Sequence, residues 1–346
     1  MADRSAIEWT DASWNCIRAR NLVTGKLGWH CEHATTGCEF CYAEGFNKRL
    51  GTGLPFKPGH RKDIEILCDD VMLTQPLRWK KPRKIFVCSM TDLFADFVTD
   101  EWIDKMFAVM ALAPQHTFQV LSKRAARMRD YFADPLQHNR VELAAEAIRP
   151  SVGAPFSPKH VLPRILPNVW LGVSTERQQE ADERIPLLLQ TPAAVRFISA
   201  EPLLGPISLR WAKWDDWKGR TDIDHLDGAR MLDWVIVGGE SGPKARPMHP
   251  DWVRELRDQC GEAGIAFFLK QWGEWAPGEC AQKAPTRTER TATWFADEWM
   301  YGALTPRASE ETHYDDAPDV YRLGKKAAGR LLDGVEHNEF PTPRPQ

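Results

Sequence analysis

The stretch WVIVGGES at residues 234–241 shows the pattern that decides the fold of this chain. Four apolar residues suit a strand buried on both faces, and the glycines and polar residues after them suit a loop. The same pattern recurs at 84–88 (KIFVC), 117–121 (TFQVL), 169–173 (VWLGV), 195–199 (VRFIS) and 266–269 (AFFL). With a further N-terminal strand expected near residues 6–9, the pattern predicts about seven strands.

Helical periodicity separates these strands. Amphipathic segments occur at 99–113, 124–132, 176–190 and 250–262. Apolar strands that alternate with helices are typical of a parallel sheet with helices on its faces. No glycine-rich phosphate fingerprint follows the first strand, which disfavours a dinucleotide-binding fold. We therefore predict an α/β fold with a parallel (β/α) barrel, partial or complete and TIM-like.

The predicted barrel domain covers residues 1–275, and the length of 346 residues suits one such barrel with insertions. A proline-spaced insertion is expected at 133–167 and a tryptophan-containing one at 205–231. We predict an irregular insertion at 276–318 and a helical tail at 319–346 that packs on the barrel.

Composition narrows the functional class. Hydrophobic residues make up 43% of the chain and charged residues 27%, as in ordinary globular proteins. The net charge of −3 excludes a uniformly basic nucleic-acid coat but allows local basic patches. No signal peptide or membrane-spanning segment is evident, so we expect a cytoplasmic protein without membrane contacts. The eight cysteines are therefore expected to be thiols or metal ligands rather than disulfides.

Cysteine spacing gives the strongest functional signal. Cys31, Cys38 and Cys41 form a C-x6-C-x2-C motif in a loop before a helix expected near Ala43. Clustered thiolates suit zinc or an iron–sulfur cluster. Three cysteines on a [4Fe–4S] cluster would leave one iron open for a non-protein ligand such as S-adenosylmethionine. A zinc site would instead need a fourth ligand from Cys16, His30 or His33.

Polar residues at the ends of the predicted strands are further candidates. Cys88, Ser174, Glu201, Glu240 and Lys270 all follow or end apolar segments, where a barrel carries its active site. Each also has a structural alternative. Glu201 and Lys270 suit an ion-pair network, Glu240 a solvated tight turn, and Cys88 simple core packing. Cys68, Cys260 and Cys280 have no partner at ligand spacing and are expected to be ordinary.

Several motifs together resemble a three-cysteine-motif family of phage and bacterial proteins, itself similar to radical S-adenosylmethionine enzymes of the spore photoproduct lyase type. They lie at 7–11 (IEWTD), 14–15, 37–44 (GCEFCYAE), 89–94 (SMTDLF), 111–123, 172–173, 201–205 (EPLLG), 238–247 (GGESGPKARP), 268–273 (FLKQWG) and 324–334.

The resemblance implies a radical enzyme. Cys31, Cys38 and Cys41 would hold a [4Fe–4S] cluster, and Glu240, Ser174 and Glu201 would orient S-adenosylmethionine. Two departures weaken this implication. Radical enzymes usually have C-x3-C-x2-C spacing, and the insertion at 16–30 adds Cys16 and His30, either of which could cap the fourth iron.

The expected substrate is a nucleobase or nucleic acid, in repair or modification. Cys88 would donate a hydrogen atom to a product radical, and Lys270 would bind an anionic group. Basic clusters at 78–84, 123–129 and 325–330 could track a phosphate backbone beside stacking aromatic residues. The alternative is a non-catalytic, zinc-stabilised nucleic-acid-binding or phage accessory protein. A separately encoded partner protein is a further possibility that the sequence leaves open.

Overall fold

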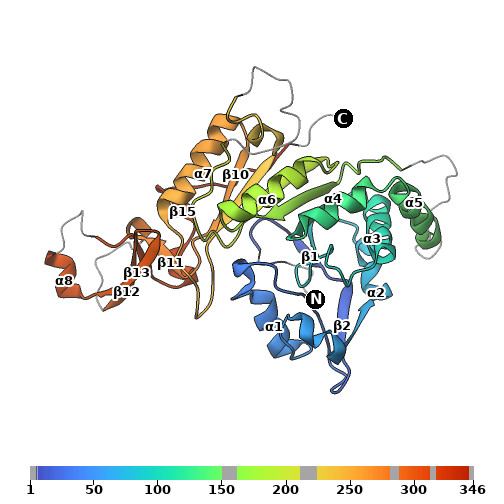
Figure 1. The fold of residues 1–346 in the computed structure, drawn as a ribbon, viewed down its shortest axis with the longest axis horizontal. Helices are drawn as coiled ribbons and strands as arrows, with labels where there is room; N and C mark the ends of the chain where they lie inside the picture. The colour runs from blue at the N-terminus through green and yellow to red at the C-terminus, as the bar shows by residue number, and fades with distance from the viewer. Residues whose placement is uncertain are drawn as a thin grey trace. The chain divides into compact units, whose positions relative to one another are not determined.

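The computed structural model describes residues 5, 7–149, 162–210, 224–280, 288–311 and 317–342. Its largest element is a seven-stranded sheet with the order β1-β5-β6-β7-β8-β9-β10 (Figure 1). These strands are β1 (Ala12–Trp14), β5 (Lys84–Val87), β6 (Thr117–Ser122), β7 (Val169–Ser174), β8 (Val195–Ala200), β9 (Trp234–Gly238) and β10 (Ala266–Gln271). Neighbouring strands run parallel, as β1 does with β5 and β9 with β10. Because β1 and β10 are the edges of this order, the α/β fold contains a partial parallel barrel.

Six of the seven predicted strands are confirmed to within one or two residues, but the N-terminal one is wrong. The first strand begins at Ala12, which pairs with Ile85, and not at residues 6–9. Trp9 is buried in a turn, and the Asp11 N–H donates to the Lys84 carbonyl at 2.9 Å. The apolar character of Trp9 therefore reflects burial beside the sheet and not membership of a strand.

The predicted helices are confirmed as α1 (Tyr42–Leu50), α3 (Asp100–Leu112), α4 (Ala125–Ala133), α6 (Gln178–Leu189) and α7 (Pro250–Ala263). Helix α5 (Gln137–Ile148) lies inside the range expected to be a proline-spaced insertion. The prolines of that range lie outside residues 137–148, and the helix buries Val141 and Ala145, four residues apart on one face. Three short helices complete the set: α2 (Asp70–Leu73), α8 (Pro306–Glu311) and α9 (Lys325–Ala328). None of the helices in the described ranges is long and apolar enough to cross a membrane.

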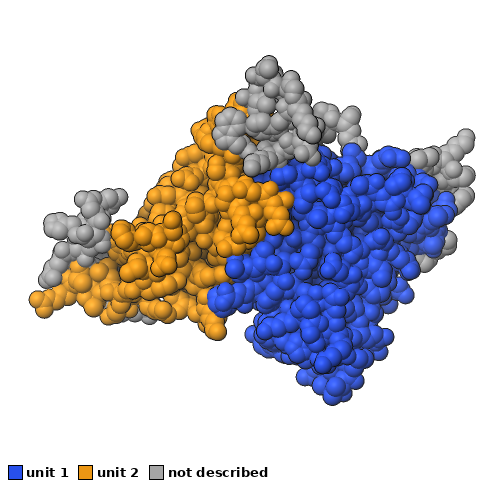
Figure 2. Space-filling model, in the orientation of Figure 1, with its two compact units in different colours: residues 1–173, 184–197, 343–346 blue, residues 174–183, 198–342 orange. Residues whose placement is uncertain are grey.

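The chain forms two compact units (Figure 2). Unit 1 comprises residues 1–173, 184–197 and 343–346. It contains a second, antiparallel sheet of β3 (Leu27–Gly28), β2 (Ile17–Asn21) and β4 (Ile64–Cys68). This small sheet and α1 frame the loop that carries the three motif cysteines.

Unit 2 comprises residues 174–183 and 198–342 and corrects two predictions. The range 276–318 is not simply irregular, because β12 (Glu289–Phe295) and β13 (Glu298–Leu304) form an antiparallel hairpin there. They join β11 (Trp275–Pro277) and β14 (Val320–Arg322) in a four-stranded sheet. The alternation of apolar and polar residues in the hairpin was obscured by three aromatic side chains close together, Trp294 and Phe295 in β12 and Trp299 in β13.

The C-terminal segment is not a helical tail. Beyond the short helix α9 it forms β15 (Leu331–Leu332) and β16 (Val335–Glu336). It then covers the outer edge of β10, where Asn338 forms an antiparallel bridge with Phe268. The Leu269 N–H donates to the His337 carbonyl at 3.1 Å, and the indole N–H of Trp234 donates to the Glu339 carbonyl at 2.8 Å. The last strand of the barrel is thus paired on its open side.

The tryptophans act mainly in packing. Trp9, Trp14, Trp234 and Trp272 are among the most deeply buried side chains. Trp252, Trp294 and Trp299 pack together in unit 2, with ring centroids 4.9–5.8 Å apart. Trp211, Trp214 and Trp217, which marked the predicted insertion at 205–231, lie outside the described residues.

Candidate functional site

The three motif cysteines lie in one loop of unit 1, between β3 and α1. Cys38 ends a short 3-10 turn, and Cys41 is the residue that precedes α1. Cys31 and Cys41 pack against a small apolar cluster of Trp29, Ala43, Phe56 and Met90. The local fold therefore brings residues of the loop into one partly buried environment.

Burial keeps the thiols of Cys31 and Cys41 protonated when nothing is bound. It raises the pKa of Cys31 far above the ordinary value, and the charges of Asp92, Cys41 and Cys38 raise it further. Burial also raises the pKa of Cys41, although the N–H groups of Ala43 and Glu44 at the start of α1 partly offset this. A metal would have to displace the thiol protons.

The donor set fits a sulfur-ligated metal group in its chemistry. The thiols are near enough for their charges to interact, and Cys38 Sγ accepts a hydrogen bond from the Ala34 N–H at 3.4 Å. The buried indole N–H of Trp29 has no hydrogen-bond partner among the described residues. It belongs to the cluster against which Cys31 and Cys41 pack, so it could donate to sulfur of a bound group. In the ranges that the structure describes, however, no three His, Cys, Asp or Glu side chains are already arranged to hold a metal ion.

The candidate fourth ligands have other partners. Nε2 of His30 lies 3.3 Å from Glu32, and Nε2 of His33 lies 2.7 Å from Glu44. Cys16 shares a hydrogen bond with Cys68, a cysteine that has no partner at ligand spacing in the sequence. Among the described residues these contacts use Nε2 of each histidine, which leaves Nδ1 as the ring nitrogen that could bind a metal.

Asn47 holds the base of the cysteine loop, and the sequence did not single it out. Its side chain is completely buried in α1. Its Oδ1 accepts from the N–H of Trp29 at 2.9 Å and of Thr52 at 3.1 Å. Its Nδ2 donates to the Thr52 hydroxyl at 2.8 Å and to the Leu54 carbonyl at 3.0 Å. These bonds tie the segment entering the loop to the segment that follows α1.

Two buried carboxylates hold the rest of the loop. Glu32 accepts from the Arg61 guanidinium, which lowers the pKa of Glu32 despite its burial. Glu44 accepts from the Phe56 N–H at 3.0 Å, from Lys48 and from His33. Burial alone would raise the pKa of Glu44, but these donors lower it. Of these contacts the sequence shows only the Glu44–Lys48 pair, four residues apart, because the other three donors lie 11 to 29 residues from their carboxylates in the chain.

The segments that follow β5 and β6 contact the cysteine loop, and the segment that follows β1 is bonded to the one after β5. After β5, the Thr91 hydroxyl donates to the His30 carbonyl at 2.6 Å. Asn15, after β1, accepts from the Met90 N–H at 3.0 Å. After β6, the Ser122 hydroxyl donates to Asp92 at 2.8 Å. The exposed phenol of Tyr42 donates to the Ser89 carbonyl at 2.9 Å.

Cys88 lies at the end of β5, where it was expected. It is buried and has a left-handed backbone with φ of 56°. Burial raises the pKa of its thiol well above the usual range, and the charges of Asp92, Cys68 and Cys31 act in the same direction. A left-handed conformation is costly for a residue with a Cβ atom, so this turn is held by its surroundings.

Glu201 and Lys270 form a polar pair in unit 2. Lys270 Nζ lies 3.1 Å from Glu201 Oε1, and the Ser199 hydroxyl donates to the other carboxylate oxygen at 3.1 Å. A Cβ atom at Gly238 would come within 2.5 Å of Oε1, so a glycine is needed for the carboxylate to lie there. The ion pair that was the structural alternative for these residues is thus present.

Glu240 is neither solvated nor free. Arg246 donates to both of its carboxylate oxygens, from Nε at 2.9 Å and Nη2 at 2.8 Å. The preceding Gly239 is required by close packing, since a Cβ atom there would lie 1.9 Å from the Trp272 carbonyl oxygen. A guanidinium therefore occupies the position that the sequence assigned to a cofactor ammonium.

Ser174, the last predicted cofactor residue, is buried at the end of β7. Its neighbour Thr175 is completely buried, and its hydroxyl has no hydrogen-bond partner among the described residues. The same holds for the side-chain oxygen of Gln271 at the end of β10. Unit 2 therefore contains two unsatisfied polar groups among the residues that end its strands.

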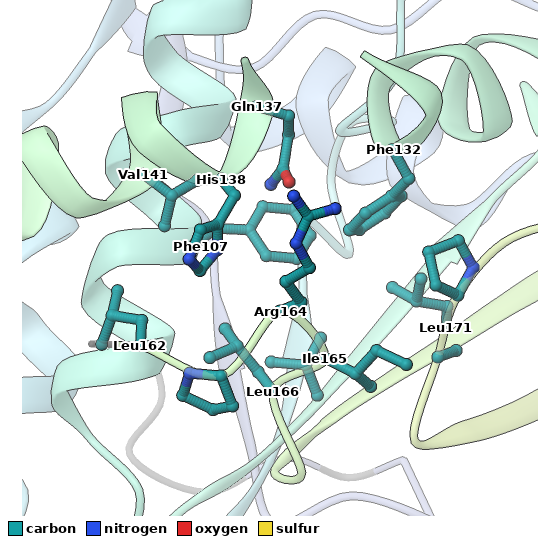
Figure 3. Close-up of a pocket in the computed structure, with 14 residues that line it drawn as sticks. Phe107, Phe132, Gln137, His138, Val141, Leu162, Arg164, Ile165, Leu166 and Leu171 are labelled. Carbon is teal, nitrogen blue, oxygen red and sulfur yellow. The ribbon is translucent and has the colours of Figure 1, made fainter. Parts of the chain in front are cut away.

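A small cavity of unit 1 contains none of these residues (Figure 3). Its volume of about 20 Å³ allows roughly one water molecule. Figure 3 shows the rings of Phe107 and Phe132 on one side and Leu162, Ile165 and Leu166 on the other. Gln137, His138 and Arg164 also line it, but a volume of this size is too small for a substrate.

Most of the predicted basic clusters have structural partners. Arg127 donates to the carbonyls of Ala95 and Val98, and Arg330 donates to the Leu269 carbonyl. In the cluster at 78–84, Arg83 lies over the Trp79 ring at 4.6 Å. In that cluster, therefore, one guanidinium group stacks on an aromatic ring.

An exposed apolar stripe on α1 was not predicted. Tyr42, Phe46 and Leu50 are spaced four residues apart and are all exposed. Residues four apart lie on one helix face, and Arg49 lies over the Phe46 ring at 5.9 Å. The stripe begins directly after Cys41, which places aromatic surface beside the cysteine loop.

Comparison with known proteins gives one match. The family described as "Protein of unknown function (DUF5131)" matches residues 4–341. No curated protein and no solved structure matches the chain.

Proposed function

We propose that this chain, which belongs to the DUF5131 family of proteins of unknown function, is an iron–sulfur enzyme similar to the radical S-adenosylmethionine enzymes. The observation that carries the proposal is the loop of Cys31, Cys38 and Cys41, set beside the unpartnered N–H of Trp29. Polar strand ends around this loop are the arrangement by which α/β barrels build active sites.

The proposed ligands are the three cysteine thiolates, one for each of three irons of a [4Fe–4S] cluster. When bound and reduced, the cluster would supply one electron for cleavage of the S-adenosylmethionine sulfonium, which starts hydrogen abstraction from a substrate. The Trp29 N–H would donate to sulfur, and hydrogen bonds to sulfur help set a cluster's potential.

Roles for the other candidates follow from their chemistry. Ser174 and Glu201 are the proposed cofactor-binding residues, since a hydroxyl and a carboxylate suit ribose hydroxyls or an ammonium group. Glu240 could take this role only if Arg246 released it. Buried and protonated, the Cys88 thiol is suited to donate a hydrogen atom, and Lys270 to bind an anionic group once separated from Glu201.

A nucleobase or nucleic acid is the proposed substrate. The stripe of Tyr42 and Phe46 offers rings on which bases can stack, and Arg49 adds a positive charge next to them. The Arg83–Trp79 pair combines the same two features. Repair or modification of a base is the reaction class that unites this surface with radical chemistry.

Anaerobic purification followed by iron and sulfide analysis tests the proposal. We expect a brown protein that cleaves S-adenosylmethionine after reduction. Cys31→Ser, Cys38→Ser and Cys41→Ser should each lose iron, while Cys260→Ser, at a buried thiol of α7, should retain it. A colourless protein that contains zinc, or equal iron in all four variants, would overturn it.

A zinc-stabilised, non-catalytic nucleic-acid-binding protein is the second candidate. His33 favours it, because a zinc-ligating histidine usually gives its other ring nitrogen to a carboxylate, as His33 does to Glu44. On this hypothesis His33→Ala releases zinc as fully as Cys38→Ser. On the iron–sulfur hypothesis His33→Ala keeps its iron.

A further inference from the structure

A second pair of cysteines, Cys16 and Cys68, lies outside the three-cysteine motif. Cys16 directly precedes β2, and Cys68 is the last residue of β4. The two strands pair antiparallel, with Ile17 opposite Cys68. The Asp69 N–H donates to the Cys16 carbonyl at 2.8 Å, so the backbone holds the two cysteines at the same end of the small sheet.

The two thiols share a hydrogen bond, and their surroundings differ. Cys16 is buried, and its burial raises the pKa of its thiol well above the usual range. Cys68 is partly exposed, and the hydrogen bond from Cys16 lowers its pKa, an effect to which Lys105 contributes. Cys68 is thus the accessible thiol that ionises first, and Cys16 is a protonated thiol in contact with it.

We propose that Cys16 and Cys68 form a dithiol site that hydrogen peroxide oxidises to an intramolecular disulfide. The Cys68 thiolate attacks the peroxide O–O bond, forming a sulfenic acid and releasing hydroxide. The Cys16 thiol then attacks the Cys68 sulfur, forming the S–S bond and releasing water. Overall two thiols lose two electrons and two protons, and one peroxide becomes two molecules of water.

The position of the site suggests what the reaction is for. A disulfide between Cys16 and Cys68 would close a covalent loop around the segment that contains Cys31, Cys38 and Cys41. It would restrain β2 and β4, which frame the cysteine loop, whether that loop holds iron, zinc or nothing. The inference therefore does not depend on the proposed enzymatic activity.

Cys280 provides an internal control for reactivity. It is also partly exposed, but burial and the charge of Glu279 raise the pKa of Cys280 to about 11. Because the pKa of Cys68 is lowered from the ordinary 9.0 whereas that of Cys280 is about 11, Cys68 should hold at least about 100-fold more thiolate near neutral pH. The lower intrinsic nucleophilicity of Cys68 reduces this advantage to about tenfold in rate. The comparison is made within one molecule and needs no variant.

The experiment treats the reduced full-length chain with equimolar hydrogen peroxide, blocks the remaining thiols by alkylation, and maps them by peptide mass spectrometry. We expect a Cys16–Cys68 cross-linked peptide, formed about tenfold faster than any oxidation of Cys280. The same cross-link should form in the Cys31→Ser/Cys38→Ser/Cys41→Ser variant, which separates this result from the fate of a cluster.

A second measurement tests the order of events. Cys16→Ser should stop at a Cys68 sulfenic acid that dimedone traps, whereas Cys68→Ser should leave Cys16 unoxidised. Cross-linking of Cys68 to a different cysteine, oxidation of Cys68 to sulfinic acid without a disulfide in the unsubstituted chain, or equal rates for Cys68 and Cys280 would each overturn the proposal.

Discussion

Replacing Asn47 with alanine should both destabilise unit 1 and release any metal from the cysteine loop. The substitution removes four side-chain hydrogen bonds, two to backbone N–H groups, one to a carbonyl and one to the Thr52 hydroxyl. A buried hydrogen bond contributes about 0.5–1.5 kcal/mol, and partners left unsatisfied cost more. Four such bonds give an expected loss of about 2–6 kcal/mol in the free energy of unfolding.

The glycines next to Asn47 leave room for its side chain. Cβ atoms at Gly28 and Gly51 would lie 2.6 and 2.1 Å from Asn47 Oδ1, so both glycines leave room for the amide. Aspartate has nearly the same shape but lacks the two donors. Asn47→Asp should therefore fall between the original protein and Asn47→Ala.

Urea denaturation followed by circular dichroism measures the change, and metal analysis of the purified variants measures its effect on the loop. The matched control is Asn168→Ala, which removes two bonds from the same unit, to the carbonyls of Met110 and Ala113. It should cost about half as much by the same reckoning and leave metal content unchanged. A loss below about 1 kcal/mol for Asn47→Ala would refute the argument, as would full metal retention.

Three further predictions concern packing and charge. Gly172→Ala should destabilise the chain by about 1–3 kcal/mol, because its Cβ would lie 2.5 Å from the Phe197 ring. In thermal melting, adding Phe197→Leu should restore part of the stability lost in Gly172→Ala. Arg254 lowers the pKa of Asp333. The small stabilisation from this ion pair is therefore present above the ordinary aspartate pKa and is lost as the pH falls through the lowered value. Asp333→Asn should flatten that part of the curve of stability against pH, and an unchanged slope would contradict the prediction. Phe340→Ala should cost about 1–3 kcal/mol in denaturant titration, since it removes ring contacts with Trp234 and Phe268, and a change below 0.5 kcal/mol would count against that packing.

The repeated strands and helices could be predicted because each is a local pattern. Apolar runs such as the one at Trp234 become strands buried on both faces, and they end where polar residues begin. The β12–β13 hairpin could not be predicted in this way, because its exposed edge keeps Phe295 and Met300 in solvent and breaks the alternation. Local patterning fails where a strand is buried over only a short part of its length, as β12 is at Thr291 and Ala292.

The sequence predicted only those parts of the site that depend on residues close together in the chain. The spacing of Cys31, Cys38 and Cys41 identified the loop, since one loop carries all three. The roles of Asn47 and Cys68 depend on neighbours brought together by sheet pairing and helix docking, which spacing cannot show. Whether Glu201 and Ser174 bind a cofactor stays a prediction.

The segment that covers β10 has a consequence for folding during synthesis. Asn338 leaves the ribosome about 70 residues after its partner Phe268, a delay of roughly 4–14 s at ordinary translation rates. During that interval the strand presents unpaired N–H and C=O groups beside an apolar sequence, which can pair with strands of other nascent chains. A chain arrested or truncated before Asn338 should therefore aggregate more readily than the full-length protein.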